Sequence, residues 1–193
     1  MERVPSNASS DATRQAALLG AAFRDLHGAR VHGFALLVTL GDAVRAARIA
    51  SEVLAAGADN AGSLRHPERA AAWLRARVVL AARRGAPKAR QQGWAARRGA
   101  LADLGTDRRA FAGLAALNVV ERAAIVTLDV EHFDPRDAET VLGLSTGALE
   151  RVVARARRRY AAAWIAAPRG HDATSDDGDL ARHIRDAAHR ALS

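Results

Sequence analysis

The sequence predicts an all-α fold of two small helical domains joined by a basic linker. Apolar residues recur at helical spacing along most of the chain, and no segment alternates apolar and polar residues as a half-buried strand would. Aromatic residues are only 4% of the 193 residues, so the core must be built from Ala, Leu and Val, which suit closely packed helices better than sheets. Cysteine is absent, which excludes disulfides, a thiol nucleophile and thiolate metal sites.

The first predicted domain covers residues 12–86 and follows a flexible N-terminus at 1–11. A long helical pattern begins near Asp11, a suitable N-cap, and Gly28 and Gly33 are expected to bend or interrupt it.

Two further helices complete this domain. The first helical pattern ends at Gly41-Asp42. A new helix is predicted over 43–56, with Asp42 as its N-cap. Pro67 then lies in the first turn of a third helix, which ends near Arg83.

The predicted linker covers residues 87–106. It is basic and rich in helix-breaking residues, and no acidic residue occurs from position 83 to position 98. A short helix around Trp94 is compatible with this composition.

The second predicted domain covers residues 107–167 and is followed by a tail, 168–193, with a short amphipathic helix. It starts near Asp107 with a helix whose face carries Phe111, Leu114 and Leu117, and Asn118 then caps a new helix and forms a capping-box-like pair with Glu121. The predicted helix starts that follow are Asp134-Pro135, for a helix to Leu142, and Ser145, for a helix to about Ile165.

The segment from Pro135 to Val153 fits the helix-turn-helix template, with Gly143 at the turn. The inner face of its second helix is predicted to comprise Leu149, Val152, Val153, Ala156 and Tyr160. The opposite face carries three arginines, which are Arg151, Arg155 and Arg158. They span ~10 Å along the helix, a length that suits tracking a phosphate strand. A helical hairpin with a solvated outer face is the alternative.

The charge balance favours a polyanionic partner. Lys and Arg total 29 against 21 Asp and Glu, for a formal charge of +8, and all of these basic residues except Lys88 are arginine. Arginine suits phosphate and base edges, which favours nucleic acid; arginine on ordinary solvated helix faces remains the other interpretation.

At this point the chain resembles bacterial RNA polymerase sigma factors of the extracytoplasmic-function class, over about residues 15–166. The similarity to sigma region 4 rests on Leu114 to Leu117, Glu121-Arg122, Phe133 to Gly143, Leu144 to Gly147, and Ala154 to Arg157. The similarity to sigma region 2 rests on Leu26 to Phe34, Gly41-Asp42, the helix to Leu54, Pro67 to Arg69, and Trp73 to Arg75.

The resemblance implies a promoter-specificity subunit that binds core RNA polymerase and catalyses nothing. Region 4 would bind −35 DNA through the helix starting at Ser145, and the implied DNA contacts are Ser145, Thr146, Glu150, Arg151, Arg155 and Arg158. Region 2 would bind polymerase through Arg45, Arg48, Ile49 and Glu52. An anti-sigma factor would be a further partner.

A second hypothesis stays open: a sigma-derived DNA-binding regulator or protein-interaction module that no longer supports initiation. Ala47 and Arg48 stand where the family usually carries an acidic pair that docks polymerase. Glu139 stands inside the first helix where the family usually carries a small alanine, and Glu150 stands in the second helix at a usually basic position.

The sequence favours no enzyme, cofactor or metal. It lacks a phosphate-binding Gly-rich loop and a G-x-S-x-G elbow. His27 and His32 are five residues apart, and His183 and His189 six, so neither pair shares a helix face as i, i+4 ligands would. No apolar run approaches the ~18–20 residues that span a bilayer, so we expect no membrane insertion and a cytoplasmic protein.

Overall fold

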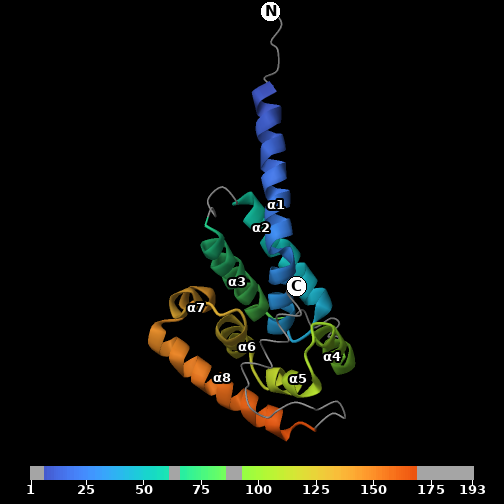
Figure 1. The fold of residues 1–193 in the computed structure, drawn as a ribbon, viewed down its shortest axis with the longest axis vertical. Coiled ribbons are helices and arrows are strands. Elements are labelled where there is room, and N and C mark those ends of the chain that lie inside the picture. Colours follow the sequence, from blue (N-terminus) through green and yellow to red (C-terminus); the bar gives the residue numbers. More distant parts are fainter. Residues whose placement is uncertain (1–6, 61–65, 86–92, 169–193) are drawn as a thin grey trace, which may run out of the picture.

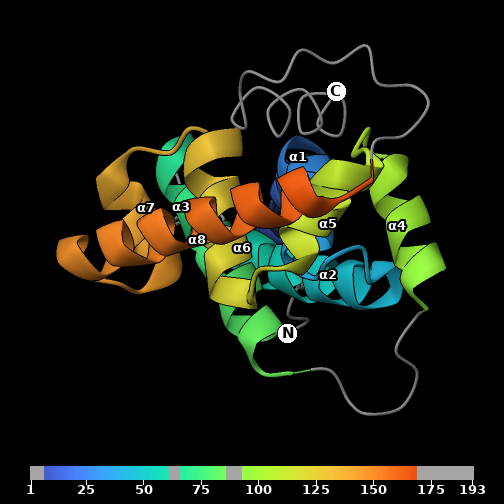
Figure 2. The same ribbon diagram turned by 90° about the horizontal axis from the view of Figure 1, so that it is seen from below.

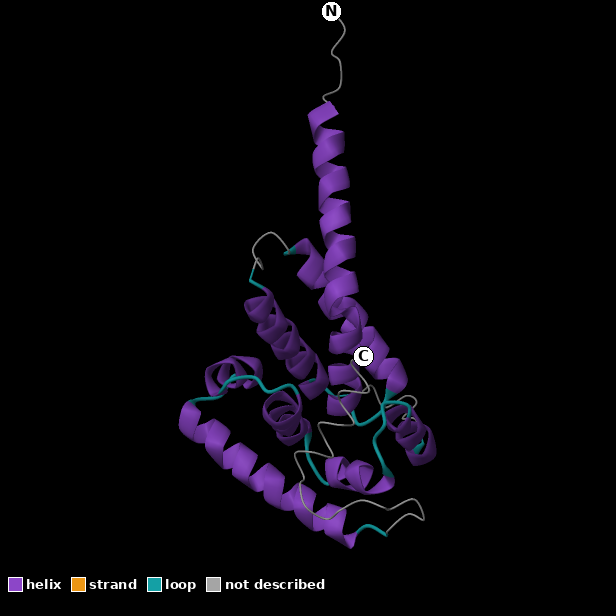
Figure 3. Ribbon diagram, viewed as in Figure 1, coloured by secondary structure: helices purple, strands orange, loops and turns teal. Residues whose placement is uncertain are grey.

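The computed structural model describes residues 7–60, 66–85 and 93–168. Within these ranges every regular element is helical (Figure 3), which confirms the all-α class. The elements are α1 (Asn7–Val38), α2 (Ala43–Asp59), α3 (Pro67–Arg83), α4 (Trp94–Ala102), α5 (Arg108–Ala115), α6 (Val119–Ile125), the π-helical η1 (Val126–Val130), α7 (Pro135–Leu142) and α8 (Thr146–Ala166).

α1 and α2 form an antiparallel pair. Small residues let them approach closely: a Cβ at Gly57 would lie 2.6 Å from the Phe23 ring, and a Cβ at Gly20 would lie 3.5 Å from the Ala58 Cβ. The N-terminal part of α1 extends beyond the rest of the described chain (Figure 1).

The first helix starts earlier than expected and is not interrupted. α1 begins at Asn7, so residues 7–11 of the predicted flexible terminus are helical, and it runs without interruption to Val38. Gly28 lies inside the helix, where an added Cβ would be 4.0 Å from the Leu54 Cδ1 of α2, an ordinary van der Waals distance. The chain turns only at Leu40 and Gly41, both with positive φ.

The predicted helix starts are confirmed by their caps. The side chains of Asp42, Asp107 and Asp134 each accept a hydrogen bond from a backbone N–H of the first turn. Asn118 and Glu121 form the complete capping box, with N···O distances of 3.0 and 3.1 Å. These short-range bonds satisfy donors that helix ends leave free, so the sequence alone specifies them.

The π-helical turn η1 was not predicted. It continues α6 with a widened backbone ring, closed by the Glu131 N–H donating to the Val126 carbonyl at 2.9 Å. Asp129 lies within this turn and is buried.

Part of the predicted linker is helical. α4 occupies residues 94–102 and buries Leu101, while residues 86–92 lie outside the described ranges. The backbone of α4 packs against the α1–α2 turn so closely that a Cβ at Gly41 would lie 2.1 Å from the Arg97 carbonyl oxygen. The predicted tail helix falls in 169–193, also outside the described residues.

The two halves pack together. α3 lies against α7 and α6, and α1 also contacts α6. The buried apolar residues of both halves belong to one continuous cluster, which includes Phe34 and Leu74 from the first and Ile125 and Tyr160 from the second. A buried ion pair between Arg75 of α3 and Glu131 crosses the boundary. A division into two separate domains is therefore not confirmed.

Candidate nucleic-acid interface

α7 and α8 are joined by the short turn 143–145. Gly143 ends α7 in the left-handed region (φ +63°), a conformation that glycine adopts without strain, and the Leu144 N–H donates to the Glu139 carbonyl at 3.1 Å. Ser145 occupies the N-cap of α8 as predicted, although its side chain makes no capping bond.

The inner face of α8 is close to the prediction. Leu149, Val153, Ala156 and Tyr160 are buried, and Val152 is half-buried. These residues pack on α5, α6 and α7. Their burial fixes the rotation of α8 and leaves five arginines on its remaining surface, which are Arg151, Arg155, Arg157, Arg158 and Arg159.

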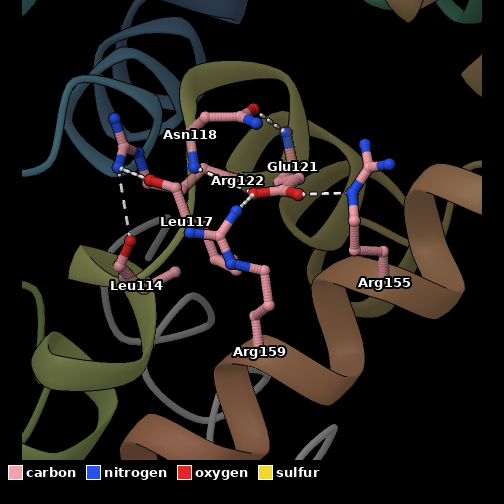
Figure 4. Close-up of polar contacts among 7 residues, drawn as sticks. All are labelled: Leu114, Leu117, Asn118, Glu121, Arg122, Arg155 and Arg159. Atoms are coloured by element: carbon pink, nitrogen blue, oxygen red, sulfur yellow. Dashed lines mark hydrogen bonds and ion pairs between the residues drawn. The ribbon is translucent and has the colours of Figure 1, made fainter.

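Glu121 organises two of these arginines (Figure 4). Its carboxylate accepts from Arg155 at 2.8 Å and from Arg159 at 2.7 Å, and its side chain is only 1% exposed. Burial raises the pKa of Glu121. The bonds from Arg155, the Asn118 N–H and Arg159 outweigh burial and hold that pKa below its usual value. The carboxylate therefore stays ionised and fixes α8 against α6.

A third arginine of α8 is also committed. Arg157 pairs with the buried Asp129 through its Nε (3.2 Å) and Nη2, and the hydrogen bond to Asp129 raises the pKa of Arg157. Arg155, Arg157 and Arg159 therefore serve the packing of α8 in the free protein. The Nε of Arg155 is bound to Glu121, whereas the Arg155 side chain as a whole is 53% exposed.

Arg151 and Arg158 remain open. Both are exposed, and neither forms an ion pair or side-chain hydrogen bond within the described part of the chain. The Arg151 guanidinium lies over the first turn of α8, 3.6 Å from where Gly147 would carry a Cβ. The predicted contacts Ser145, Thr146 and Glu150 are exposed beside it.

Arg122 is structural. It is buried next to Glu121 and donates to the Val38 carbonyl at 2.9 Å and to the carbonyls of Leu114 and Leu117, the last two drawn in Figure 4. Burial and the nearby Arg97 and Arg45 lower its pKa to about 10, so Arg122 stays charged at neutral pH. It ties the end of α1 to α5.

The residues expected to bind polymerase on α2 are largely used within the protein. Ile49 is fully buried, because its position on α2 faces α1 and α3 rather than solvent. Arg45 is half-buried and donates to the Ala82 carbonyl at 2.6 Å. Arg48 and Glu52 are exposed, but they pair with each other at 2.9 Å.

Sequence reasoning missed the arginines that hold α8. The spacing of Arg155 from Arg151 and Arg158 placed it correctly on the outer surface, but Glu121 is 34 residues away in sequence. The capping box marked Glu121 as a helix-start residue without indicating its second role.

Within the described ranges, no group of three or more His, Asp and Glu side chains could hold a metal ion. Likewise, no described helix combines the length and apolar character needed to cross a membrane. No protein-family model, curated protein or solved structure matches the chain.

Proposed function

We propose that the protein is a sigma-like transcription factor that binds promoter DNA through the outer face of α8, with α7, the 143–145 turn and α8 acting as a helix-turn-helix. The observation that carries this proposal is the division among the five α8 arginines. Three neutralise buried carboxylates, whereas Arg151 and Arg158 are solvent-exposed and have no ion pair among the residues that the structure describes. An unpaired arginine on a helix held rigidly by its opposite face is well suited to a phosphate oxygen.

The geometry of this face fits a duplex. Arg151 and Arg158 are seven residues apart, which is ~10 Å along the helix and reaches more than one phosphate. Ser145 and Thr146 lie at the start of α8, where hydroxyl groups and the positive end of the helix dipole favour an anion. Glu150 lies on the same exposed surface and is the candidate for reading a cytosine amino group.

In its first form, the proposed function is transcription initiation in the cytoplasm. Its partners are then core RNA polymerase and an anti-sigma factor. The α2 surface supports a second candidate, a DNA-binding regulator that does not initiate transcription. Ile49 is buried, and Arg45 donates a hydrogen bond to α3. Arg48 and Glu52 form an ion pair with each other. Little of the expected polymerase-binding face therefore remains free.

The DNA-binding proposal is tested by the salt dependence of binding to a 30-base-pair duplex of mixed sequence, followed by fluorescence anisotropy. Arg151→Ala with Arg158→Ala removes two phosphate contacts and lowers the slope of log K against log salt by about 1.8. Arg155→Ala is the matched control on the same helix and leaves the slope nearly unchanged. The assignment is refuted if Arg155→Ala lowers the salt slope as much as the Arg151→Ala, Arg158→Ala double variant does. It is also refuted if the double variant leaves the slope unchanged.

The two forms of the function are separated by a second experiment. The purified full chain is mixed with bacterial core RNA polymerase, and co-elution is followed by run-off transcription from a duplex selected for tight binding. Co-elution with a transcript supports initiation. DNA binding without co-elution supports the regulator.

A further inference from the structure

The projecting part of α1 carries an apolar face that the rest of the described chain leaves uncovered. Leu18, Leu19 and Leu26 are 65%, 54% and 65% exposed, although they are large apolar side chains on one continuous helix. A helix advances about 100° per residue, so five exposed residues fall within one stripe about 100° wide. We call these residues the α1 stripe, and they are Leu18, Leu19, Ala22, Leu26 and Ala29. A contiguous exposed apolar surface of this kind indicates a site of interaction.

The α1 stripe points away from the core of the protein. The opposite side of α1 packs on α2, where Gly20 lies against Ala58. The other described helices gather around the C-terminal part of α1 (Figures 1 and 2). Gly33 and Leu36 continue the direction of the stripe along the helix, and both are buried. The protein therefore covers this side of α1 from about residue 33 onward and leaves it open before that residue.

Two opposite charges lie along one edge of the stripe. Arg14 and Asp25 are exposed and lie within about 20° of each other around α1, on the side of Leu18. Along the helix axis they are about 16 Å apart. The edge is therefore positive toward the N-terminal end of α1 and negative toward the body of the protein. A second copy of this edge complements the first when it runs in the opposite direction, as it does across a two-fold axis.

We propose that the protein forms a homodimer through the α1 stripe, with two copies of α1 antiparallel about a two-fold axis near residue 20. Residue 20 is the middle of the segment 7–33, so each copy of α1 lies along the whole open length of the other. In this register Arg14 of one copy is level with residue 26 of the other and reaches Asp25. Leu18 is level with Ala22 of the second copy, so a large side chain meets a small one between the helices.

The antiparallel direction also keeps the bodies of the two copies apart. In an antiparallel pair the covered parts of α1, from residue 33 onward, lie at opposite ends of the dimer. In a parallel pair they would lie at the same end, where the burial of Gly33 and Leu36 shows that the stripe side of α1 is already occupied. A parallel pair would also place Arg14 beside Arg14 and Asp25 beside Asp25, and like charges disfavour such an interface.

Self-association of the full chain is measured by sedimentation equilibrium from about 1 to 200 μM, a range that covers weak and moderate interfaces. The mass is expected to rise from 20.4 kDa toward twice that value. Leu19→Lys with Leu26→Lys places like charges in the interface and weakens dimerisation more than about 100-fold. Both positions are exposed and lysine is a good helix former, so the monomer keeps its fold. Val44→Lys is the matched control, because Val44 of α2 is an apolar residue that is 71% exposed and lies outside the stripe.

Exchange of the edge charges tests the direction of the pair. Asp25→Arg places two like charges at each end of the antiparallel interface and weakens the dimer roughly 10-fold. Adding Arg14→Asp to this variant makes the charges opposite again and restores the affinity. In a parallel pair neither substitution changes the affinity in this way, because each charge then faces its own copy.

A mass that stays at 20.4 kDa up to the highest concentration overturns the proposal. So does a dimer that the double lysine variant leaves intact, that Val44→Lys weakens equally, or that Asp25→Arg leaves unchanged. Leu18→Gln with Leu26→Gln provides an independent test of the same face should the lysine variant alter the circular dichroism spectrum. The Arg151→Ala, Arg158→Ala variant of α8 is expected to dimerise like the wild type, so this result is independent of the DNA-binding proposal.

Discussion

Replacing Arg75 by methionine removes one partner of the buried ion pair between α3 and the residue that follows η1. The Arg75 and Glu131 side chains are 3% and 7% exposed, and three hydrogen bonds of 2.6, 2.9 and 3.3 Å join them. The Arg75 guanidinium also lies 5.8 Å from the Phe34 ring centroid and 5.9 Å from that of Phe133. This group is one of the buried polar contacts between the two halves, as is the bond from Arg122 to the Val38 carbonyl.

The expected loss in the free energy of unfolding depends on which buried charged groups each variant leaves without a partner. Arg75→Met leaves the Glu131 carboxylate buried without a partner, which typically costs about 3–5 kcal/mol. The Nη1 atom of Arg75 is buried without a hydrogen-bond partner, so the substitution also removes one unsatisfied donor. We therefore expect a loss near the lower end, about 3 kcal/mol, and a thermal midpoint roughly 6–12 °C lower. Arg75→Met with Glu131→Leu removes both charges and recovers most of this loss.

The measurement is urea unfolding followed by circular dichroism at 222 nm, with the free energy of unfolding extrapolated to water. Arg48→Met is the control, because Arg48 and Glu52 form an ion pair whose side chains are 53% and 56% exposed, and its loss costs less than about 0.5 kcal/mol. The reasoning is refuted if Arg75→Met lies within about 1 kcal/mol of the wild type, or if the double variant is less stable than the single one.

Three other predictions concern stability. Glu121→Ala removes a capping partner and the shared acceptor of Arg155 and Arg159, so the free energy of unfolding falls by about 1–3 kcal/mol. Arg155→Ala, at a half-exposed position, lowers the free energy of unfolding by less than about 1 kcal/mol in the same urea assay. Gly41→Ala forces α4 away from the α1–α2 turn and lowers the free energy of unfolding by more than about 2 kcal/mol. Gly85→Ala, also at positive φ but with open space around it, lowers it by about 1 kcal/mol. Equal losses in the two variants would contradict the close approach of Arg97 to Gly41. Burial, Arg75 and Arg30 lower the pKa of His27, so its neutral form contributes stability that is present above the unfolded pKa of about 6.5 and is lost as the pH falls through the folded value. Thermal midpoints between pH 7.5 and 5 therefore fall less steeply in His27→Gln than in the wild type, and parallel curves would exclude this contribution.

The sequence by itself determined where most helices of the second half begin, although it did not indicate the π-helical η1. The caps at Asn118 and Asp134 and the turn at Gly143 depend on bonds between residues three to five positions apart, which a local pattern contains. The inner face of α8 was predictable for the same reason, since helical periodicity fixes which residues share a face.

Only the tertiary structure decided which charges are free. Arg151 and Arg155 have the same spacing signal, but Arg155 is bound to Glu121, 34 residues away, because α6 packs against α8. Arg75 and Glu131 are 56 residues apart and meet because α3 packs on the second half. The burial of Ile49 likewise depends on the approach of α1 and α3. Charge and periodicity are local properties of the chain, whereas pairing and burial depend on how the helices pack.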